Sequence, residues 1–164
     1  MVSAVFCCLS FCFMIKSIQN IHKEDCIMDY SNLVKEALEA RKMAYIPYSG
    51  FAVGAALLTK EGKIYRGCNI ENAAFGPTNC AERTAFFKAV SEGEREFAAI
   101  AIVGGPKDNA PVDYCYPCGV CRQVMAEFCG DDFIVVIGKS EEDFKVHTLS
   151  DVLPFTFREP DLHR

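Results

Sequence analysis

Cys80-Ala81-Glu82 and Pro117-Cys118-Gly119-Val120-Cys121 are the two stretches around which this chain is organised. Together they offer three thiols, and a carboxylate that is not needed as a ligand. Three protein ligands leave a zinc ion with an open fourth position, which distinguishes a catalytic site from a structural one. Glu82 is then free to move protons for a water molecule at that position. The two stretches therefore predict a catalytic metal centre.

The same stretches predict how the thiols meet. Cys118 and Cys121 stand at i and i+3 in the first turn of a predicted helix, so both sulfurs reach one metal ion. Cys80 approaches from the start of a second predicted helix. Both helix N-termini bring partial positive charge towards the thiolates. Three thiolates still give a zinc centre a net negative charge, which opposes the activation of water, and we expect Arg83 to compensate it.

A closed structural site is the alternative at this centre. Cys115-Tyr116-Pro117-Cys118 is itself a Cys-x-x-Cys, so Cys115 offers a fourth ligand. A four-cysteine site gives Glu82 no task, and Cys115 precedes the proline instead of sharing the helix. We therefore favour three ligands, Cys80, Cys118 and Cys121, around one zinc ion per chain. None of the three histidines lies near the motif, so a histidine ligand is not expected.

Composition indicates one globular domain with a small-molecule substrate. Hydrophobic residues make up 51% of the chain and charged residues 24%, which suffices for a single core. The net charge is −5 without a basic cluster, so we expect no nucleic-acid partner, because phosphate neutralisation supplies most non-specific affinity. Ten cysteines suit a disulfide framework in a secreted chain. The long apolar runs and the Pro-Cys-x-x-Cys instead favour metal binding in a reducing cytoplasm, and disulfides remain the alternative.

The first 27 residues differ from the rest of the chain. Val2 to Ile15 is nearly all apolar but too short for an ordinary membrane span. It also lacks the preceding positive charge and the cleavage site of a signal peptide. We interpret residues 1–27 as an extension outside the fold, and residues 28–164 as the functional domain. We expect no membrane partner, although a regulatory or membrane-contacting tail is the alternative.

Beyond Met28, the hydrophobic pattern predicts a mixed α/β domain. Helices are predicted at 31–44, 80–90 and 118–129, and strands at 51–59, 64–68, 97–103, 133–137 and 146–149. The first two strands are joined by a short turn and form a hairpin. A hairpin followed by helix, strand, helix and strand implies one mixed sheet with helices on its faces.

Four blocks of sequence extend these observations. In chain order they are Pro47-Tyr48-Ser49-Gly50-Phe51-Ala52-Val53-Gly54-Ala55-Ala56, Asn69-Ile70-Glu71-Asn72-Ala73, Cys80-Ala81-Glu82-Arg83-Thr84-Ala85 and Pro117-Cys118-Gly119-Val120-Cys121-Arg122-Gln123. Together they resemble the small homotetrameric zinc-dependent cytidine deaminases. The resemblance implies a three-layer α/β/α sandwich with a five-stranded mixed sheet. It also implies hydrolytic deamination of cytidine and deoxycytidine to uridine and deoxyuridine, with release of ammonia, in pyrimidine salvage.

The resemblance further assigns roles to particular residues. It makes Cys80, Cys118 and Cys121 the zinc ligands and Glu82 the proton shuttle. It places the ribose hydroxyls on Asn69 and Glu71, and the pyrimidine against Phe51 and Ala81. It makes Phe157, with Phe155 as the alternative, an aromatic residue that a neighbouring subunit lends to the site. Without the motifs, Phe51 and Phe157 would be interpreted as core residues and Asn69 as a loop cap.

Three other functions remain open at this point. A deaminase of another cytosine-bearing small molecule, such as an aminoacyl-nucleoside antibiotic, shares the cysteine and glutamate residues, but Asn69 and Glu71 favour a plain nucleoside. An editor of cytidine in polynucleotides is disfavoured by the acidic composition, and a non-catalytic zinc module by Glu82. The loop from Gly104 to Pro117 is longer than is usual in the family, which affects the rim of the site and its selectivity.

Overall fold

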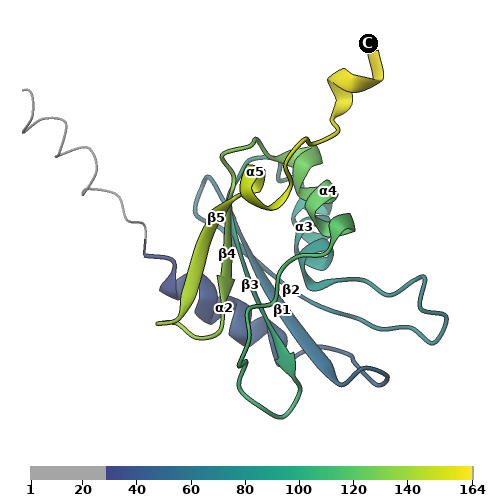
Figure 1. The fold of residues 1–164 in the computed structure, drawn as a ribbon, viewed down its shortest axis with the longest axis vertical. Coiled ribbons are helices and arrows are strands. Elements are labelled where there is room, and N and C mark those ends of the chain that lie inside the picture. The colour runs from purple at the N-terminus through teal and green to yellow at the C-terminus, as the bar shows by residue number, and fades with distance from the viewer. Residues whose placement is uncertain (1–28, 164) are drawn as a thin grey trace, which may run out of the picture.

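The computed structural model of the chain describes residues 29–163, so the interpretation of residues 1–27 lies outside the described part. Its centre is a five-stranded mixed sheet in the order β2-β1-β3-β4-β5 (Figure 1). The strands are β1 (Phe51–Thr59), β2 (Ile64–Cys68), β3 (Phe97–Pro106), β4 (Ile134–Gly138) and β5 (Phe144–Thr148). The helices are α2 (Ser31–Arg41), α3 (Ala81–Ser91), α4 (Gly119–Phe128) and α5 (Leu149–Val152), with a final 3₁₀ turn at Glu159–His163.

Strand pairing brings several chain segments to one edge of the sheet. β1 pairs antiparallel with both β2 and β3, so that Phe51 at the start of β1 lies opposite Pro106 at the end of β3. β3 and β4 are parallel, which requires a crossover connection, and α4 provides it. The carboxyl ends of β2 and β3, and the loops that lead from them into α3 and α4, therefore meet beside the start of β1.

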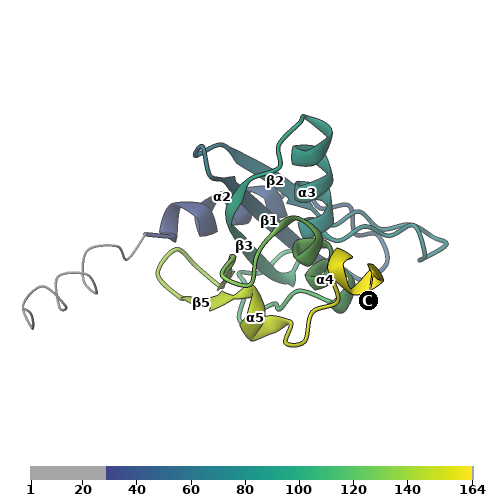
Figure 2. The same ribbon diagram turned by 90° about the horizontal axis from the view of Figure 1, so that it is seen from above.

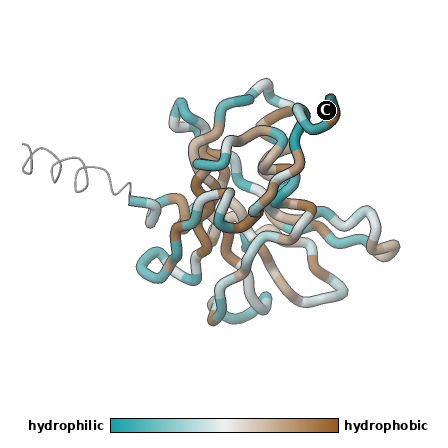
Figure 3. Tube along the Cα trace, turned by 45° about the horizontal axis from the view of Figure 1, so that its top comes forward, coloured by the Kyte–Doolittle hydropathy of each residue, from teal (hydrophilic) through white to brown (hydrophobic). Residues whose placement is uncertain are grey.

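Helices cover both faces of the sheet, as the sequence predicts (Figure 2). Successive strand residues point to opposite faces. The buried sheet residues against α2 are alanines and valines: Ala56, Ala99, Ala101, Val103 and Val136. The face covered by α3 and α4 also carries larger leucine and isoleucine side chains: Leu57, Ile100, Ile102 and Ile137. The result is the predicted three-layer α/β/α sandwich, in which hydrophobic segments gather in the middle of the molecule (Figure 3).

Two glycines let helices lie directly on strands. A Cβ at position 54 would overlap the backbone of α2 at Ala37, and a Cβ at position 67 would overlap the backbone of α3 at Ala81 and Ala85. Backbone atoms in a packed helix cannot yield without moving the helix. Gly67 therefore determines how closely the first turn of α3 approaches β2.

The first helix is shorter than the sequence predicts. It ends at Arg41 instead of Ala44, and Met43, predicted to be on its apolar face, is 76% exposed. Tyr45 leaves the helix because its amide and carbonyl hydrogen-bond to Asn69 and Glu71, which draws the chain towards the loop after β2. The remaining boundaries fall within a few residues of the prediction. No helix in the part of the chain that the structure describes is long and apolar enough to cross a membrane.

The close approach at Gly67 generates a stability prediction. Gly67→Ala should lower the free energy of unfolding by about 3 kcal/mol, because the added methyl group overpacks a contact between backbone atoms. Gly119→Ala is the matched control, since a Cβ there meets no atom within 4 Å. Urea denaturation of both variants checks the prediction, and equal stabilities would contradict it.

Candidate functional site

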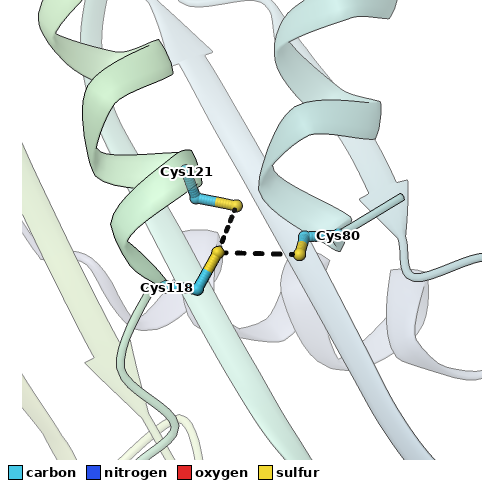
Figure 4. A group of neighbouring side chains, drawn as sticks. All are labelled: Cys80, Cys118 and Cys121. Atoms are coloured by element: carbon cyan, nitrogen blue, oxygen red, sulfur yellow. Dashed lines mark hydrogen bonds between the residues drawn. The ribbon is translucent and has the colours of Figure 1, made fainter. Parts of the chain in front are cut away.

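Three cysteine sulfurs converge where α3 and α4 begin (Figure 4). The Sγ atoms of Cys80 and Cys118 are 3.8 Å apart, and those of Cys118 and Cys121 are 3.5 Å apart. All three sulfurs lie within 4.8 Å of one another. This is the separation expected of ligands of a single ion, and the three residues are the ones that the sequence predicts.

Two of these thiols are positioned by the first residues of α3 and α4. Cys80 and Cys118 are the N-cap residues of α3 and α4, both with extended backbone angles, and neither uses its side chain to cap its helix. Their sulfurs therefore remain available to a metal. Cys121 follows in the first turn of α4 and is 1% exposed, so that packing fixes its side chain. Positive helix ends face the cluster from two directions, which favours thiolates.

Arg83 lies against the cluster from the first turn of α3. Its Nη2 atom is 3.6 Å from Cys80 Sγ and also donates a hydrogen bond of 3.0 Å to the carbonyl of Thr78. Its Nε atom is buried and has no hydrogen-bond partner among the described residues. An unsatisfied donor on a cation beside three thiols indicates a site built to hold negative charge.

The thiols respond strongly to this environment. Hydrogen bonds from Cys121 and Arg83 lower the pKa of Cys80 to about 5. The bond to Cys80 and burial raise the pKa of Cys121. Of these two thiols, Cys80 is therefore the one whose ionisation the surroundings favour.

Glu82 is a buried carboxyl group beside the cluster. It is 4% exposed, and burial raises its pKa to about 6. An acidic group with a pKa near neutrality can both accept and release a proton under physiological conditions. A buried carboxyl group with a raised pKa, next to a cluster of metal-binding cysteines, is typical of an acid–base catalyst.

Cys115 is close to the cluster but is not a member of it. Its sulfur fills the space over Gly104, where a Cβ would lie 2.6 Å from Cys115 Sγ and 3.1 Å from Phe51 Cε1. Burial raises its pKa to about 11, so that it is an unreactive neutral thiol. Among the described residues, the geometry therefore groups three cysteines and not the four of the closed alternative.

The segment around Asn69 and Glu71 lies beside the cluster. Ile70 and Asn79 exchange two backbone hydrogen bonds, which fixes this segment one residue from Cys80. Asn69 accepts from the amide of Val53 at 2.8 Å and donates to the carbonyl of Phe51 at 2.9 Å. These bonds fasten the segment to the start of β1, so a loop-capping role for Asn69 is present in the structure.

Glu71 is held by the loop before β1. Its Oε2 accepts hydrogen bonds from the amides of Tyr48 and Ser49 at 2.9 and 3.2 Å. Hydrogen bonds from the Ser49 side chain and the Tyr48 amide lower the pKa of this carboxyl group. The sequence did not predict these anchors, because amide donors in a loop leave no pattern of residue types. The carboxylate borders a cavity of about 460 Å³ that is lined by Tyr48, Ser49, Glu71, Phe75 and Thr78.

The remaining predicted contact residues occupy contrasting positions. Phe51 is 42% exposed at the start of β1, whereas the side chain of Ala81 is fully buried. Phe155 is fully exposed with a positive φ of 58°, which is uncommon for a bulky residue, and Phe157 is 56% exposed. Gln123 donates a hydrogen bond of 2.9 Å to the carbonyl of Phe157. Both C-terminal rings thus face away from the core of their own chain.

The donor set fits zinc. The three sulfurs have the spacing of thiolate ligands in a zinc site with three protein ligands. Two of them lie next to helix N-termini, and one lies beside the guanidinium group of Arg83. Only three of the four positions of a tetrahedral zinc ion are filled by the described residues. Cys80, Cys118 and Cys121 would hold the ion, with the fourth position open.

Comparison with known proteins agrees with this geometry. Residues 28–137 match the family model described as the cytidine and deoxycytidylate deaminase zinc-binding region. Cytidine deaminase from Halalkalibacterium halodurans is 53% identical over 83% of this chain and 99% of the relative, and that from Sporosarcina psychrophila is 51% identical over 82% and 96%. The crystal structure of cytidine deaminase from Burkholderia pseudomallei has a TM-score of 0.72 at 47% identity, over 79% of this chain and all of that one.

The thiol environments generate a prediction for the metal-free protein. Because its pKa is about 5, Cys80 should be alkylated by iodoacetamide at about pH 7, and its reactivity should be lost as the pH falls through about 5. Cys115 and Cys129, whose pKa values are raised by burial to about 11 and 12, should stay unmodified at neutral pH. Peptide mass spectrometry measures each site.

Arg83→Gln is the companion variant for this experiment. It removes a hydrogen bond that favours the Cys80 thiolate, so the onset of Cys80 alkylation should move to higher pH. An onset that does not move, or a Cys115 that reacts before Cys80, would contradict the assignment.

Proposed function

The chain belongs to the zinc-dependent cytidine deaminase family, and on this basis we propose that it converts cytidine and deoxycytidine to uridine and deoxyuridine by hydrolysis, releasing ammonia. The observation that carries the proposal is the pairing of an open three-cysteine cluster with the buried carboxyl group of Glu82. Related enzymes with this name are more than half identical to the chain over nearly their whole length.

Zinc and the protein divide the chemistry between them. When bound to Cys80, Cys118 and Cys121, zinc supplies a Lewis acid whose open position activates water. Glu82 moves the protons. Its raised pKa suits this task, because the carboxylate must accept a proton at one stage and release it at the next.

The proton transfers balance with Glu82 as the only carrier. Glu82 accepts a proton from the attacking water and delivers it to N3 of cytosine, while the oxygen forms a bond to C4. It then accepts the remaining hydroxyl proton and delivers it to the exocyclic amine. The C4–N bond breaks, ammonia leaves, and the C4 carbonyl of the uracil forms. Glu82 ends in its starting state, so one water and one cytidine give one uridine and one ammonia.

Arg83 balances the charge of the centre. As thiolates, Cys80, Cys118 and Cys121 would leave a zinc ion held between them with a net charge of −1, which would oppose the activation of water. The guanidinium hydrogen bond to Cys80 withdraws negative charge from one sulfur. Together with two helix N-termini, it offsets the third thiolate.

The nucleoside is proposed to bind along the edge where β1 starts. Glu71 and Asn69 contact the ribose hydroxyls, and the cavity beside Glu71 is within the size range of small-molecule sites. Although both carboxamide atoms of Asn69 already bond to β1, each keeps a second hydrogen-bonding position, as does the Glu71 carboxylate. Phe51 packs on the pyrimidine, and Ala81 contacts it through its backbone because its side chain is buried.

We also propose a homotetramer whose subunits share their sites. Phe157, or else Phe155, is the aromatic residue that each subunit contributes to a neighbouring site. This role accounts for the exposure of both rings and for the positive φ angle of Phe155. Closed point-group symmetry is the usual arrangement for such assemblies. The hydrogen bond from Gln123 to the carbonyl of Phe157 holds the C-terminal segment, which follows α5, against α4.

Residues 28–164 are proposed to carry the whole activity, without residues 1–27. The site of action is proposed to be the cytoplasm, because reduced thiols are needed to hold the metal. The substrate is a free nucleoside, and neither nucleic acid nor a membrane takes part.

Glu82→Gln tests the catalytic role. Turnover of cytidine should fall by a factor of about 10² to 10⁴, or about 3–5 kcal/mol in the barrier, because general acid–base transfer is lost. Zinc content measured by mass spectrometry should stay at one ion per chain, since Glu82 is not a ligand. Glu127→Gln, which changes an exposed carboxylate on α4, should match the parent in both measurements. An active Glu82→Gln enzyme would disprove the role.

Mixed assemblies test the sharing of sites. Glu82→Gln chains and Phe157→Ala chains, each weak alone, should gain activity when they are unfolded and refolded together with zinc. The gain arises because some hybrid sites combine an intact Glu82 with an intact Phe157 from the neighbour. Phe155→Ala in place of Phe157→Ala is the control. If the mixture only averages the two parents, Phe157 serves its own chain or no site at all.

A further inference from the structure

Arg122 lies in the second motif segment, directly after the ligand Cys121, but it has no part in the chemistry above. Its guanidinium group makes two hydrogen bonds to main-chain carbonyls. Nε donates to the carbonyl of Pro117 at 2.7 Å, and Nη1 donates to the carbonyl of Val152 at 2.8 Å. Both bonds are partly buried. The side chain therefore joins the residue before Cys118 to the end of α5.

Cys118 is the ligand that packing restrains least. Its side chain is exposed, whereas Cys121 is buried and Cys80 is partly covered. Gly119 follows it, and a Cβ at that position would meet no atom within 4 Å. The carbonyl of Pro117 belongs to the peptide bond that carries the amide of Cys118. A hydrogen bond to this carbonyl therefore fixes the plane from which the Cys118 side chain projects.

The second carbonyl that Arg122 contacts, that of Val152, lies in a well-packed part of the fold. Val152 is 8% exposed and belongs to the main core. The helix that it ends, α5, begins with a capping box in which Thr148 and Asp151 bond to each other's backbone amides. Arg122 thus connects the end of α5, which is held in place by the core, to the peptide bond before Cys118. The planar guanidinium donates from two separate nitrogen atoms held in a rigid geometry, which the single, flexibly attached ammonium group of a lysine does not reproduce.

We propose that Arg122 is a positioning residue for the zinc ligand Cys118, and that it pre-organises the three-cysteine cluster for the metal. This inference rests on the proposed metal centre and deepens it. Groups that orient metal ligands contribute to metal affinity without touching the ion, and their removal typically weakens metal binding about 10- to 100-fold. Arg122 does so through the backbone of the ligand instead of through its sulfur.

The rival explanation is that Arg122 merely anchors α4 in the fold. Arg158 provides a matched control because it makes the same kind of contacts at the other end of this helix. Its Nη1 donates to the carbonyls of Ala126 and Cys129 at 3.0 and 2.6 Å. Both arginines secure α4 through two carbonyls, but only Arg122 reaches the peptide of a ligand.

Zinc affinity of the full chain is the quantity to measure, by competition with a chromophoric chelator. Arg122→Gln and Arg122→Lys should bind zinc about 10- to 100-fold more weakly than the parent. The absorption bands of the cobalt-substituted protein should shift or broaden in both, because these bands report the geometry of the ligands. Arg158→Ala should leave zinc affinity and cobalt spectrum unchanged, even where urea denaturation shows that it is less stable. If Arg122→Gln does not fold, Arg122→Lys alone decides.

The outcomes separate this inference from the proposed function. If the parent binds zinc and deaminates cytidine while both Arg122 variants keep its zinc affinity and cobalt spectrum, the positioning role is wrong and the function stands. An equal loss of affinity in Arg158→Ala also overturns it, since general anchoring would then explain both. If the parent binds no zinc, the metal centre itself is disproved.

Discussion

The structure depends on the meeting of two helix N-termini at one edge of the sheet. The crossover through α4 brings Cys118 and Cys121 to this edge, and the antiparallel pairing of β1 with β2 and β3 brings Cys80 there from α3. The spacing of the sulfurs is therefore a product of strand order and helix packing, and none of the cysteines that the structure describes forms a disulfide. Gly67 matters for the same reason, since it determines how near α3 lies to the sheet.

Charge is the second constraint on this edge. Three thiolates and the Glu82 carboxyl group are gathered in a partly buried space, and each like charge raises the cost of the next. Two helix dipoles and the Arg83 guanidinium oppose that cost. The raised pKa of Glu82 follows from the same confinement. Burial thus raises the pKa of Glu82 into the range of an acid–base catalyst. It also makes the negative charge of the thiolates costly unless a cation such as Arg83 lies beside them.

The sequence was sufficient for the features that depend on residue type and spacing. Cys80, Cys118, Cys121 and Glu82 were predicted from two short motifs, and the five-stranded mixed sheet from periodicity and the family resemblance. The features it missed depend on the backbone. The amides that hold Glu71, the early end of α2 at Arg41 and the two carbonyls on Arg122 all involve main-chain atoms, whose positions no local pattern encodes. The contribution of Phe157 to the site of a neighbouring subunit stays a prediction.

Titration of the metal-free chain with zinc, with ammonia release from cytidine followed at each step, shows whether one zinc ion at this cluster is required for deamination. We expect no ammonia without metal, a rise in proportion to added zinc, and a plateau at one ion per chain, because the described residues form one three-cysteine cluster. Ammonia release by the metal-free protein would contradict this, as would one equivalent of tightly bound zinc without any release.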